Sequence, residues 1–267
     1  MNPDNSKTYV SAQRGVWTFA EGTFVGVRNS LSHEAESELC EYEALEYLAA
    51  LMCTLGWQIN QQLKNRRLIM SDVGQREILA QSKVIKLLVN NLDYKYLGNW
   101  RERDNTNIID PLLRQNLEAR GYDDTLIRRA TQRFTREASL PAGGSLYEVN
   151  RKVYGLLRYG VKVQRSASES FETVWLIDWA NPNANHFAVA EEVTVKGHCT
   201  KRPDLVVYVN GIALGVIELK RSKVSVGEGI RQNIGNQKSD FIRSFFTTVQ
   251  LLFAGNDVEG LRYGVID

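Results

Sequence analysis

Two apolar runs joined through Asn210-Gly211 constrain the fold of this chain more than any other feature. The runs are Leu205–Val209 and Ile212–Leu219; β-branched residues are frequent in both, and the first also contains Tyr208. Such residues favour strands, and Asn-Gly between two strand-like runs is the strongest short signal for a β-hairpin. The sequence therefore predicts two adjacent antiparallel strands at this point.

Charged residues stand at one end of this predicted hairpin. Asp204 follows Arg202-Pro203 at the start of the first strand, and Glu218 and Lys220 lie near the end of the second. Because residues i and i+2 of a strand share a face, Glu218 and Lys220 project to the same side. Two acids and a lysine on neighbouring strands suit a site that holds a hard divalent metal and directs a water at a phosphodiester. The alternative is a surface hairpin whose Glu218–Lys220 pair is only a solvated polar face.

The hairpin register decides whether the two acids can meet. A strict two-residue turn at Asn210-Gly211 would place Asp204 opposite Ile217, on the other face of the sheet from Glu218. The metal-site hypothesis therefore requires one additional residue in the hairpin. We predict a three-residue loop or a β-bulge at Gly211 or Gly215.

Length and composition indicate an ordinary globular protein. The 267 residues are 43% hydrophobic and 24% charged, which is enough for a full core in one large domain or in a domain with an appendage. The net charge of +2 does not indicate a nucleic-acid binder by itself, so any basic surface is local. No apolar stretch is long enough to cross a bilayer, and the N-terminus has no signal-peptide character. We expect a cytoplasmic protein with no membrane partner.

Several other motifs have a structural interpretation. Cys40, Cys53 and Cys199 lack metal-ligand spacing, and His198-Cys199 supplies too few ligands for zinc. The acidic run over residues 34–46 is typical of a solvated helix face. The arginines of residues 128–136 are predicted to lie on the exposed, solvated face of a helix. Contact with phosphates is the alternative. The chain has no Gly-x-x-x-x-Gly-Lys-Ser/Thr loop, which excludes a nucleotide triphosphate site of that kind.

The order of the predicted elements indicates an α/β protein. Helical periodicity predicts helices over residues 34–55, 73–92, 110–119, 123–137, 146–157 and 228–238. Besides the hairpin, strands are predicted over residues 161–163, 173–177, 187–195, 246–254 and 261–266, and a polar loop over 98–107. We predict a mixed sheet core flanked by helices over residues 71–267. Residues 1–70 are predicted to be a mainly helical N-terminal extension of unknown role.

Several blocks of this sequence resemble the N-terminal nuclease domain of type I restriction enzyme R subunits. The blocks are residues 175–187, residues 190–197 and the run from Arg202-Pro203-Asp204 to Glu218-Leu219-Lys220. The similarity covers residues 76–267, and residues 1–70 resemble no family that we recognise.

The resemblance implies a restriction-endonuclease-like PD-(D/E)xK fold and the activity of a type I site-specific deoxyribonuclease. In that family, Mg²⁺-dependent cleavage of double-stranded DNA takes place in a complex with methylation and specificity subunits. The nuclease domain there precedes two helicase-like motor domains driven by ATP. This chain has no motor motifs, so we expect it to be an N-terminal piece of a longer protein. ATP would be bound by the full-length subunit and not by this piece.

The resemblance also assigns roles to individual residues. Asp204 and Glu218 would be metal ligands, with the Leu219 carbonyl as a third ligand. Lys220 would orient or deprotonate the attacking water and stabilise the charge of the transition state. Glu77 matches the acid that the family carries on a preceding helix. Its alternative is an ordinary first-turn glutamate that the helix dipole favours.

Further residues are assigned with alternatives. Gln232 matches the glutamine of a Gln-x-x-x-Tyr element, but Asn236 stands at the tyrosine position, and Gln232 as a plain helix-surface residue is the alternative. Basic residues near the predicted site are expected to contact DNA phosphates without reading sequence: Arg221, Lys223, Arg231 and Lys238. Two rival functions stay open, a catalytically silent module that docks DNA or assembles the complex, and a repair or recombination nuclease.

Overall fold

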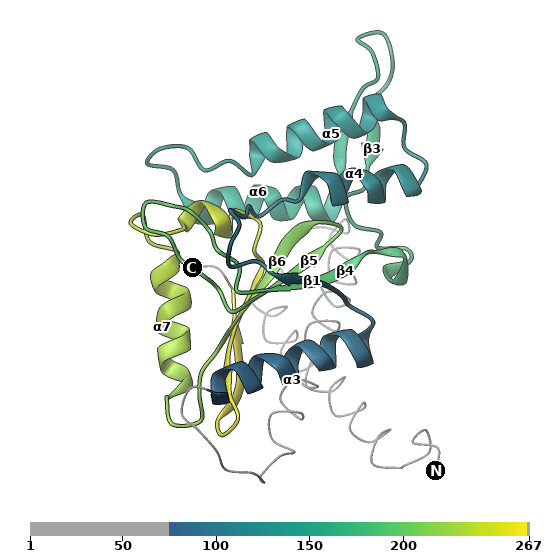
Figure 1. Ribbon diagram of the computed structural model, residues 1–267. Coiled ribbons are helices and arrows are strands. Elements are labelled where there is room, and N and C mark those ends of the chain that lie inside the picture. Colours follow the sequence, from purple (N-terminus) through teal and green to yellow (C-terminus); the bar gives the residue numbers. More distant parts are fainter. Residues whose placement is uncertain (1–74, 266–267) are drawn as a thin grey trace, which may run out of the picture. The chain divides into compact units, whose positions relative to one another are not determined.

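The computed structural model of this protein describes residues 75–265, with side chains described from residue 80 onward. Figure 1 shows how the elements of this part are arranged. Its helices are α3 (Gln75–Leu92), α4 (Asp110–Ala119), α5 (Asp124–Glu137), α6 (Leu146–Tyr159) and α7 (Val226–Asn236), with short 3-10 helices η3 (Pro182–Ala184) and η4 (Arg243–Thr247). Its strands are β1 (Lys95–Asn99), β2 (Val161–Val163), β3 (Glu172–Val174), β4 (Phe187–Glu191), β5 (Leu205–Val209), β6 (Ile212–Leu219), β7 (Leu251–Asn256) and β8 (Gly260–Gly264).

The main sheet has six strands in the order β1-β4-β5-β6-β7-β8. The pairs β1–β4 and β6–β7 are parallel, and the pairs β4–β5, β5–β6 and β7–β8 are antiparallel. A separate antiparallel pair is formed by β2 and β3. The predicted α/β class with a mixed sheet flanked by helices is confirmed.

The predicted hairpin is formed by β5 and β6, the two central strands of the sheet. Val209 pairs with Ile212, so the turn between the strands has two residues. Asn210 has φ +50° and Gly211 has φ +80°. Asparagine and glycine are the residues that adopt this left-handed conformation most readily, which explains why the chain turns here.

A β-bulge interrupts the hairpin close to its turn. Tyr208 pairs with Ala213, but Val207 pairs with Gly215, which leaves Leu214 as the extra residue. The predicted irregularity is therefore confirmed as a bulge, and it lies directly before Gly215. A bulge of one residue exchanges the two faces of the strand beyond it.

The bulge brings the two acids to one face of the sheet. Beyond it Leu205 pairs with Ile217. The next step of this register sets Asp204 opposite Glu218, instead of the Asp204–Ile217 pair that a plain two-residue hairpin would give. Side chains opposite each other in an antiparallel pair share a face.

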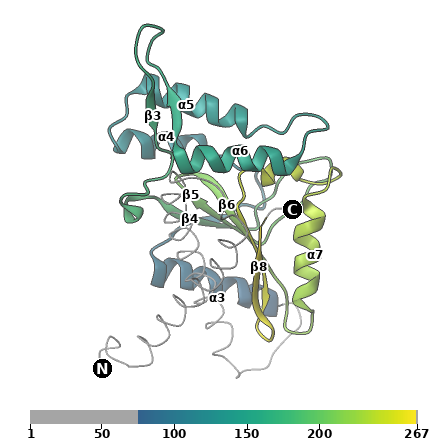
Figure 2. The same ribbon diagram turned by 180° about the vertical axis from the view of Figure 1, so that it is seen from behind.

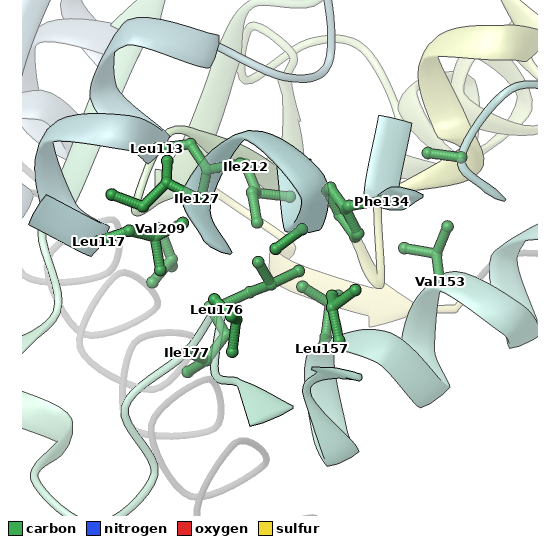
Figure 3. Close-up of a cluster of buried hydrophobic side chains, with 14 of the residues drawn as sticks. Leu113, Leu117, Ile127, Phe134, Val153, Leu157, Leu176, Ile177, Val209 and Ile212 are labelled. Carbon is green, nitrogen blue, oxygen red and sulfur yellow. The ribbon is translucent and has the colours of Figure 1, made fainter. Parts of the chain in front are cut away.

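The turn end of the hairpin is buried beneath a helical layer. Figure 2 shows α5 and α6 beyond this end of the sheet, with the β2–β3 pair beside them. Asp123 and Ser145 cap α5 and α6, because their side chains accept from the backbone N–H of Leu126 and Glu148. The apolar faces of α4, α5 and α6 meet the turn end of β5 and β6 in one cluster (Figure 3): Leu113, Leu117, Ile127, Phe134, Val153, Leu157, Leu176, Ile177, Val209 and Ile212.

A second cluster covers one face of the sheet. Alternate residues of β4, β5 and β6 point into it, as the two-residue period of a strand requires. The segment around η4 packs against them from outside the sheet. The cluster includes Ala188, Ala190, Val206, Tyr208, Ala213, Val216, Phe245, Phe246 and Leu252. Asp204 and Glu218 lie two residues from Val206 and Val216, so they continue this face toward the other end of the hairpin.

Most predicted helices agree with the structure within a few residues, but three strand predictions were wrong in extent. The strand predicted over 173–177 ends at Val174, because Leu176 and Ile177 are buried in the helical layer. The strand predicted over 187–195 ends at Glu191. The strand predicted over 246–254 begins only at Leu251, because Phe245 and Phe246 reach the second cluster from η4.

One strand was not predicted, and some predictions concern residues that the structure does not describe. β1 was not predicted, because its residues were assigned in part to a polar loop. The helix predicted over 34–55 and the helical character of residues 1–70 lie outside the described residues. Among residues 75–265, no helix combines the length and the apolar character that crossing a membrane requires.

Candidate active site

The structure brings the three predicted catalytic residues to one end of the β5–β6 hairpin. Asp204 lies directly before β5, Glu218 lies one residue before the end of β6, and Lys220 follows β6. The Asp204 Oδ2 accepts a hydrogen bond from the backbone N–H of Leu219 at 2.6 Å. The Lys220 Nζ lies 3.9 Å from Oε2 of Glu218. The two acids and the lysine therefore converge from adjacent strands, and the Asp204 carboxylate is tied to the backbone of the strand that carries Glu218.

Gln232 on α7 joins the acid to the lysine. Its Nε2 donates to Oε2 of Glu218 at 2.8 Å, and its Oε1 accepts from Nζ of Lys220 at 2.6 Å. The amide therefore fixes both side chains with hydrogen bonds of opposite polarity. Gln232 is half-buried, and its side chain contacts two of the predicted site residues. Its role at the site stays a prediction.

A close approach of α7 to the sheet makes these contacts possible. A Cβ atom on Gly229 would lie 3.0 Å from Cβ of Ala254, 3.6 Å from Cγ of Lys220 and 3.7 Å from Cβ of Glu218. The first of these distances is tighter than an ordinary contact, so a Cβ at position 229 would require Ala254 or the helix to shift slightly. Because Gln232 lies three residues further along α7, it shares a side of the helix with Gly229 and reaches the same strands.

The site is closed around Glu218 and more open at Asp204. Glu218 has 0% exposure, the Lys220 side chain is 14% exposed, and Asp204 is half-buried. A carboxylate buried in this way is costly unless a cation or hydrogen-bond donors accompany it. Lys220 and Gln232 supply both.

The donor set fits a hard divalent cation. Asp204 and Glu218 offer carboxylate oxygens, and the Leu219 carbonyl lies between Glu218 and Lys220 in the chain. Mg²⁺ is typically bound through one or two carboxylates, with water completing its shell. A carboxylate has about four lone-pair positions, so one donated hydrogen bond does not exhaust its capacity. In the part of the chain with described side chains, no group of three or more His, Cys, Asp or Glu residues is arranged to hold a metal.

The remaining predicted residues differ in their surroundings. Glu77 lies in the first turns of α3, and its side chain is outside the described residues, so its role stays a prediction. Arg221 and Lys223 are exposed in the loop between β6 and α7, and Lys238 is exposed just beyond α7. Arg231 pairs with Glu228 on the same exposed helix face, and this pairing lowers the pKa of Glu228 and raises that of Arg231. Phosphate contact by these four residues stays a prediction.

Sequence reasoning missed a group of polar residues beside Asp204. Glu192 receives hydrogen bonds from Gln81 and Arg101 and lies near Arg202. The only sequence signal was the Glu191-Glu192 pair inside a block that resembles the restriction family. No spacing rule connects these residues, because they come from three distant parts of the chain.

Comparison with known proteins identifies the family. The family model described as "Type I restriction enzyme R protein N terminus" (HSDR_N) matches residues 74–267. The chain belongs to this family. The resemblance seen in the sequence is confirmed. Residues 1–57 match a second family model, described as a protein of unknown function (Hypoth_ymh).

One curated relative is a "Putative type I restriction enzyme MjaIXP endonuclease subunit" from Methanocaldococcus jannaschii. It is 32% identical to this chain over 117 residues, which are 42% of the chain and 11% of the relative. This chain thus spans a small fraction of the length of the curated relative that it matches. The predicted division at residue 70 stays a prediction.

Proposed function

We propose that this chain is a Mg²⁺-dependent endonuclease module that hydrolyses phosphodiester bonds of double-stranded DNA. The observation that carries the proposal is the convergence of Asp204, Glu218 and Lys220 at one end of a bulged hairpin. Membership of the restriction R-subunit family supports it. A mixed sheet with two acids and a lysine at the end of adjacent strands also fits the PD-(D/E)xK fold.

Each residue of the site has a distinct task in this proposal. Asp204, Glu218 and the Leu219 carbonyl would hold the ion. When bound, Mg²⁺ supplies positive charge at the scissile phosphate and lowers the pKa of a coordinated water. Lys220 is held by Gln232 and would place its ammonium group next to the reacting phosphate. Negative charge develops there as a water oxygen bonds to phosphorus and the bond to the leaving sugar oxygen breaks. The ammonium group would stabilise that charge.

The remaining parts of the proposal concern the whole protein. We infer that the chain is the nuclease part of a longer R subunit, whose ATP-driven motor delivers DNA to the site. Methylation and specificity subunits would be its partners in the cytoplasm. Target choice would lie with those subunits, because the phosphate contacts expected of Arg221, Lys223, Arg231 and Lys238 carry no sequence information.

One observation also fits a second candidate function. Complete burial of Glu218, together with its contacts to Gln232 and Lys220, would equally suit a silent module that docks DNA on the same fold. The two candidates differ in their need for metal. A nuclease site binds Mn²⁺ or Mg²⁺ through Glu218, whereas a docking module binds DNA equally well in the presence of a chelator.

The deciding experiment uses the full R subunit with its partner subunits, ATP, Mg²⁺ and circular duplex DNA. Three single substitutions should each reduce cleavage at least about a thousandfold: Asp204→Asn, Glu218→Gln and Lys220→Ala. Each removes a metal ligand or the cation that stabilises the transition state. ATP hydrolysis should continue in all three variants. Glu118→Gln, at an exposed acid of α4 outside the site, serves as the control and should cut normally. Full cleavage by any one of the three variants would remove that residue from the site, and full cleavage by all three would overturn the proposal.

A further inference from the structure

Glu192 has an unusual backbone conformation next to the candidate site. It lies directly after β4 and has φ +51°, in the left-handed region. For a residue with a Cβ this conformation is unfavourable, and such residues often occur at functional sites. A structure that keeps this conformation must gain something from it.

In this conformation, the backbone at Glu192 and Val193 forms hydrogen bonds with Pro203 and Asp204. The N–H of Glu192 donates to the carbonyl oxygen of Asp204 at 2.8 Å, and the N–H of Val193 donates to that of Pro203 at 3.0 Å. These two hydrogen bonds fix both residues that lead into β5. The left-handed residue thus sets the position from which the Asp204 side chain projects.

The side chain of Glu192 ties three distant segments together. Its Oε1 accepts from Nε2 of Gln81 on α3 at 3.2 Å. Its Oε2 accepts from a guanidinium nitrogen of Arg101 at 3.2 Å and lies 3.5 Å from one of Arg202, the residue before Pro203. Arg202 also donates to Oγ1 of Thr194 at 3.3 Å.

The surroundings of Glu192 make these contacts effective. Its side chain is only 20% exposed, so solvent screens its ion pairs less than pairs on an open surface. Two guanidinium groups meet one carboxylate there, and hydrogen bonds with ionised partners are stronger than neutral ones. Its oxygens are engaged by nitrogen donors, which suits a supporting role outside the metal shell.

We propose that Glu192 is a positioning residue that holds Asp204 in the geometry needed for metal binding. The same contacts link this corner to α3, the helix that also contains Glu77 four residues before Gln81. This inference rests on the proposed metal site. Residues that orient metal ligands typically change metal affinity by ten- to a hundredfold when they are lost.

The test is calorimetric titration of the metal-free chain with Mn²⁺. Glu192→Gln should raise the Kd for Mn²⁺ by about tenfold or more, because it keeps the size of the side chain but loses the charge that holds the two arginines. Glu192→Asp keeps the charge and should recover part of the affinity. Asp204→Asn removes a proposed metal ligand, so its Kd for Mn²⁺ shows the effect of losing the site itself.

The neighbouring acid provides a matched control. Glu191→Gln makes the same chemical change one residue away, at a half-buried acid whose Oε1 accepts from Nδ2 of Asn99 at 3.0 Å. This variant should bind Mn²⁺ as the parent chain does. Equal effects of the two substitutions would indicate a general loss of charge and would overturn the assignment to Glu192.

A second readout separates positioning from global stability. Hydrogen exchange of the metal-free protein should become faster in Glu192→Gln at the amides of Glu192 and Val193, while amides of the helical layer stay protected. If Glu192→Gln does not fold, Arg202→Gln, whose side chain is 41% exposed, decides in its place. It should also raise the Kd, by a smaller factor, because it removes one of the three donors.

The outcomes distinguish the two proposals. If the parent chain shows no Mn²⁺ binding that depends on Asp204, the proposed function fails. If the parent chain binds Mn²⁺ and both Glu192→Gln and Arg202→Gln bind it equally well, the metal site stands and the role of Glu192 is overturned.

Discussion

The two ends of the β5–β6 hairpin differ in what surrounds them. At the turn end, Val209 and Ile212 are buried among apolar side chains of α4, α5 and α6. At the other end, Asp204, Glu218 and Lys220 meet each other and an amide of α7. The same two strands thus contribute to stability at one end and carry the candidate chemistry at the other.

This difference indicates how a charged site is kept in a folded sheet. A buried carboxylate and ammonium seldom stabilise a protein, because the cost of removing both charges from water is close to the energy regained by pairing them. The apolar contacts of the helical layer supply stability that the charged end does not. Substitutions at the two ends should therefore separate stability from metal binding.

The largest expected effect is at the turn end. Phe134→Ala should lower the free energy of unfolding by about 3–5 kcal/mol, because Phe134 is fully buried in the helical layer and its loss leaves a cavity. Urea unfolding followed by circular dichroism measures this loss. At low urea, the folded variant should keep the parent affinity for Mn²⁺. Tyr147→Ala, at an exposed aromatic residue, is the control for a change without a cavity.

A smaller effect of opposite sign is expected at the charged end. The double substitution Glu218→Gln with Lys220→Met should leave the free energy of unfolding unchanged or raise it by up to about 2 kcal/mol, because it removes a buried ion pair as a unit. Glu218→Gln alone should be less stable than the double variant, since it leaves the lysine without its acid. A double variant that loses more than about 2 kcal/mol would contradict the separation of the two ends.

The smallest expected effect is a pH dependence at the turn end. Burial, with a contribution from Lys95, lowers the pKa of His186 below its ordinary value of 6.5. The unfolded chain therefore binds a proton more readily than the folded chain, so this residue makes stability fall slightly as the pH decreases through about 6.5. His186→Gln should remove that component, measured as the difference between the unfolding free energies at pH 7.5 and pH 5.5. An identical slope in the variant would show that other groups cause it.

Local sequence signals predicted the hairpin, its irregularity and the convergence of the acids. Asn210-Gly211 predicted the turn, and the need to place Asp204 and Glu218 on one face predicted a longer loop or a bulge at Gly211 or Gly215. Helical periodicity predicted most helices for the same reason, since this signal acts over a few residues.

Contacts between distant segments could not be predicted in this way. Gln81 and Glu192 are 111 positions apart, and no spacing in the sequence relates them. The strand β1 was missed because it depends on pairing with β4, and Phe246 was assigned to a strand because aromatic residues are frequent there. Pairing with a distant strand decided the first case and burial decided the second, and both depend on the whole fold.

The most direct test of the central claim is a crystal structure of the chain grown with Mn²⁺, with anomalous differences measured at the manganese absorption edge. We predict one strong anomalous peak between the carboxylates of Asp204 and Glu218, within about 2.0–2.4 Å of an oxygen of each. A peak elsewhere, or no peak at a Mn²⁺ concentration that saturates binding in solution, would contradict the assignment of these residues as metal ligands.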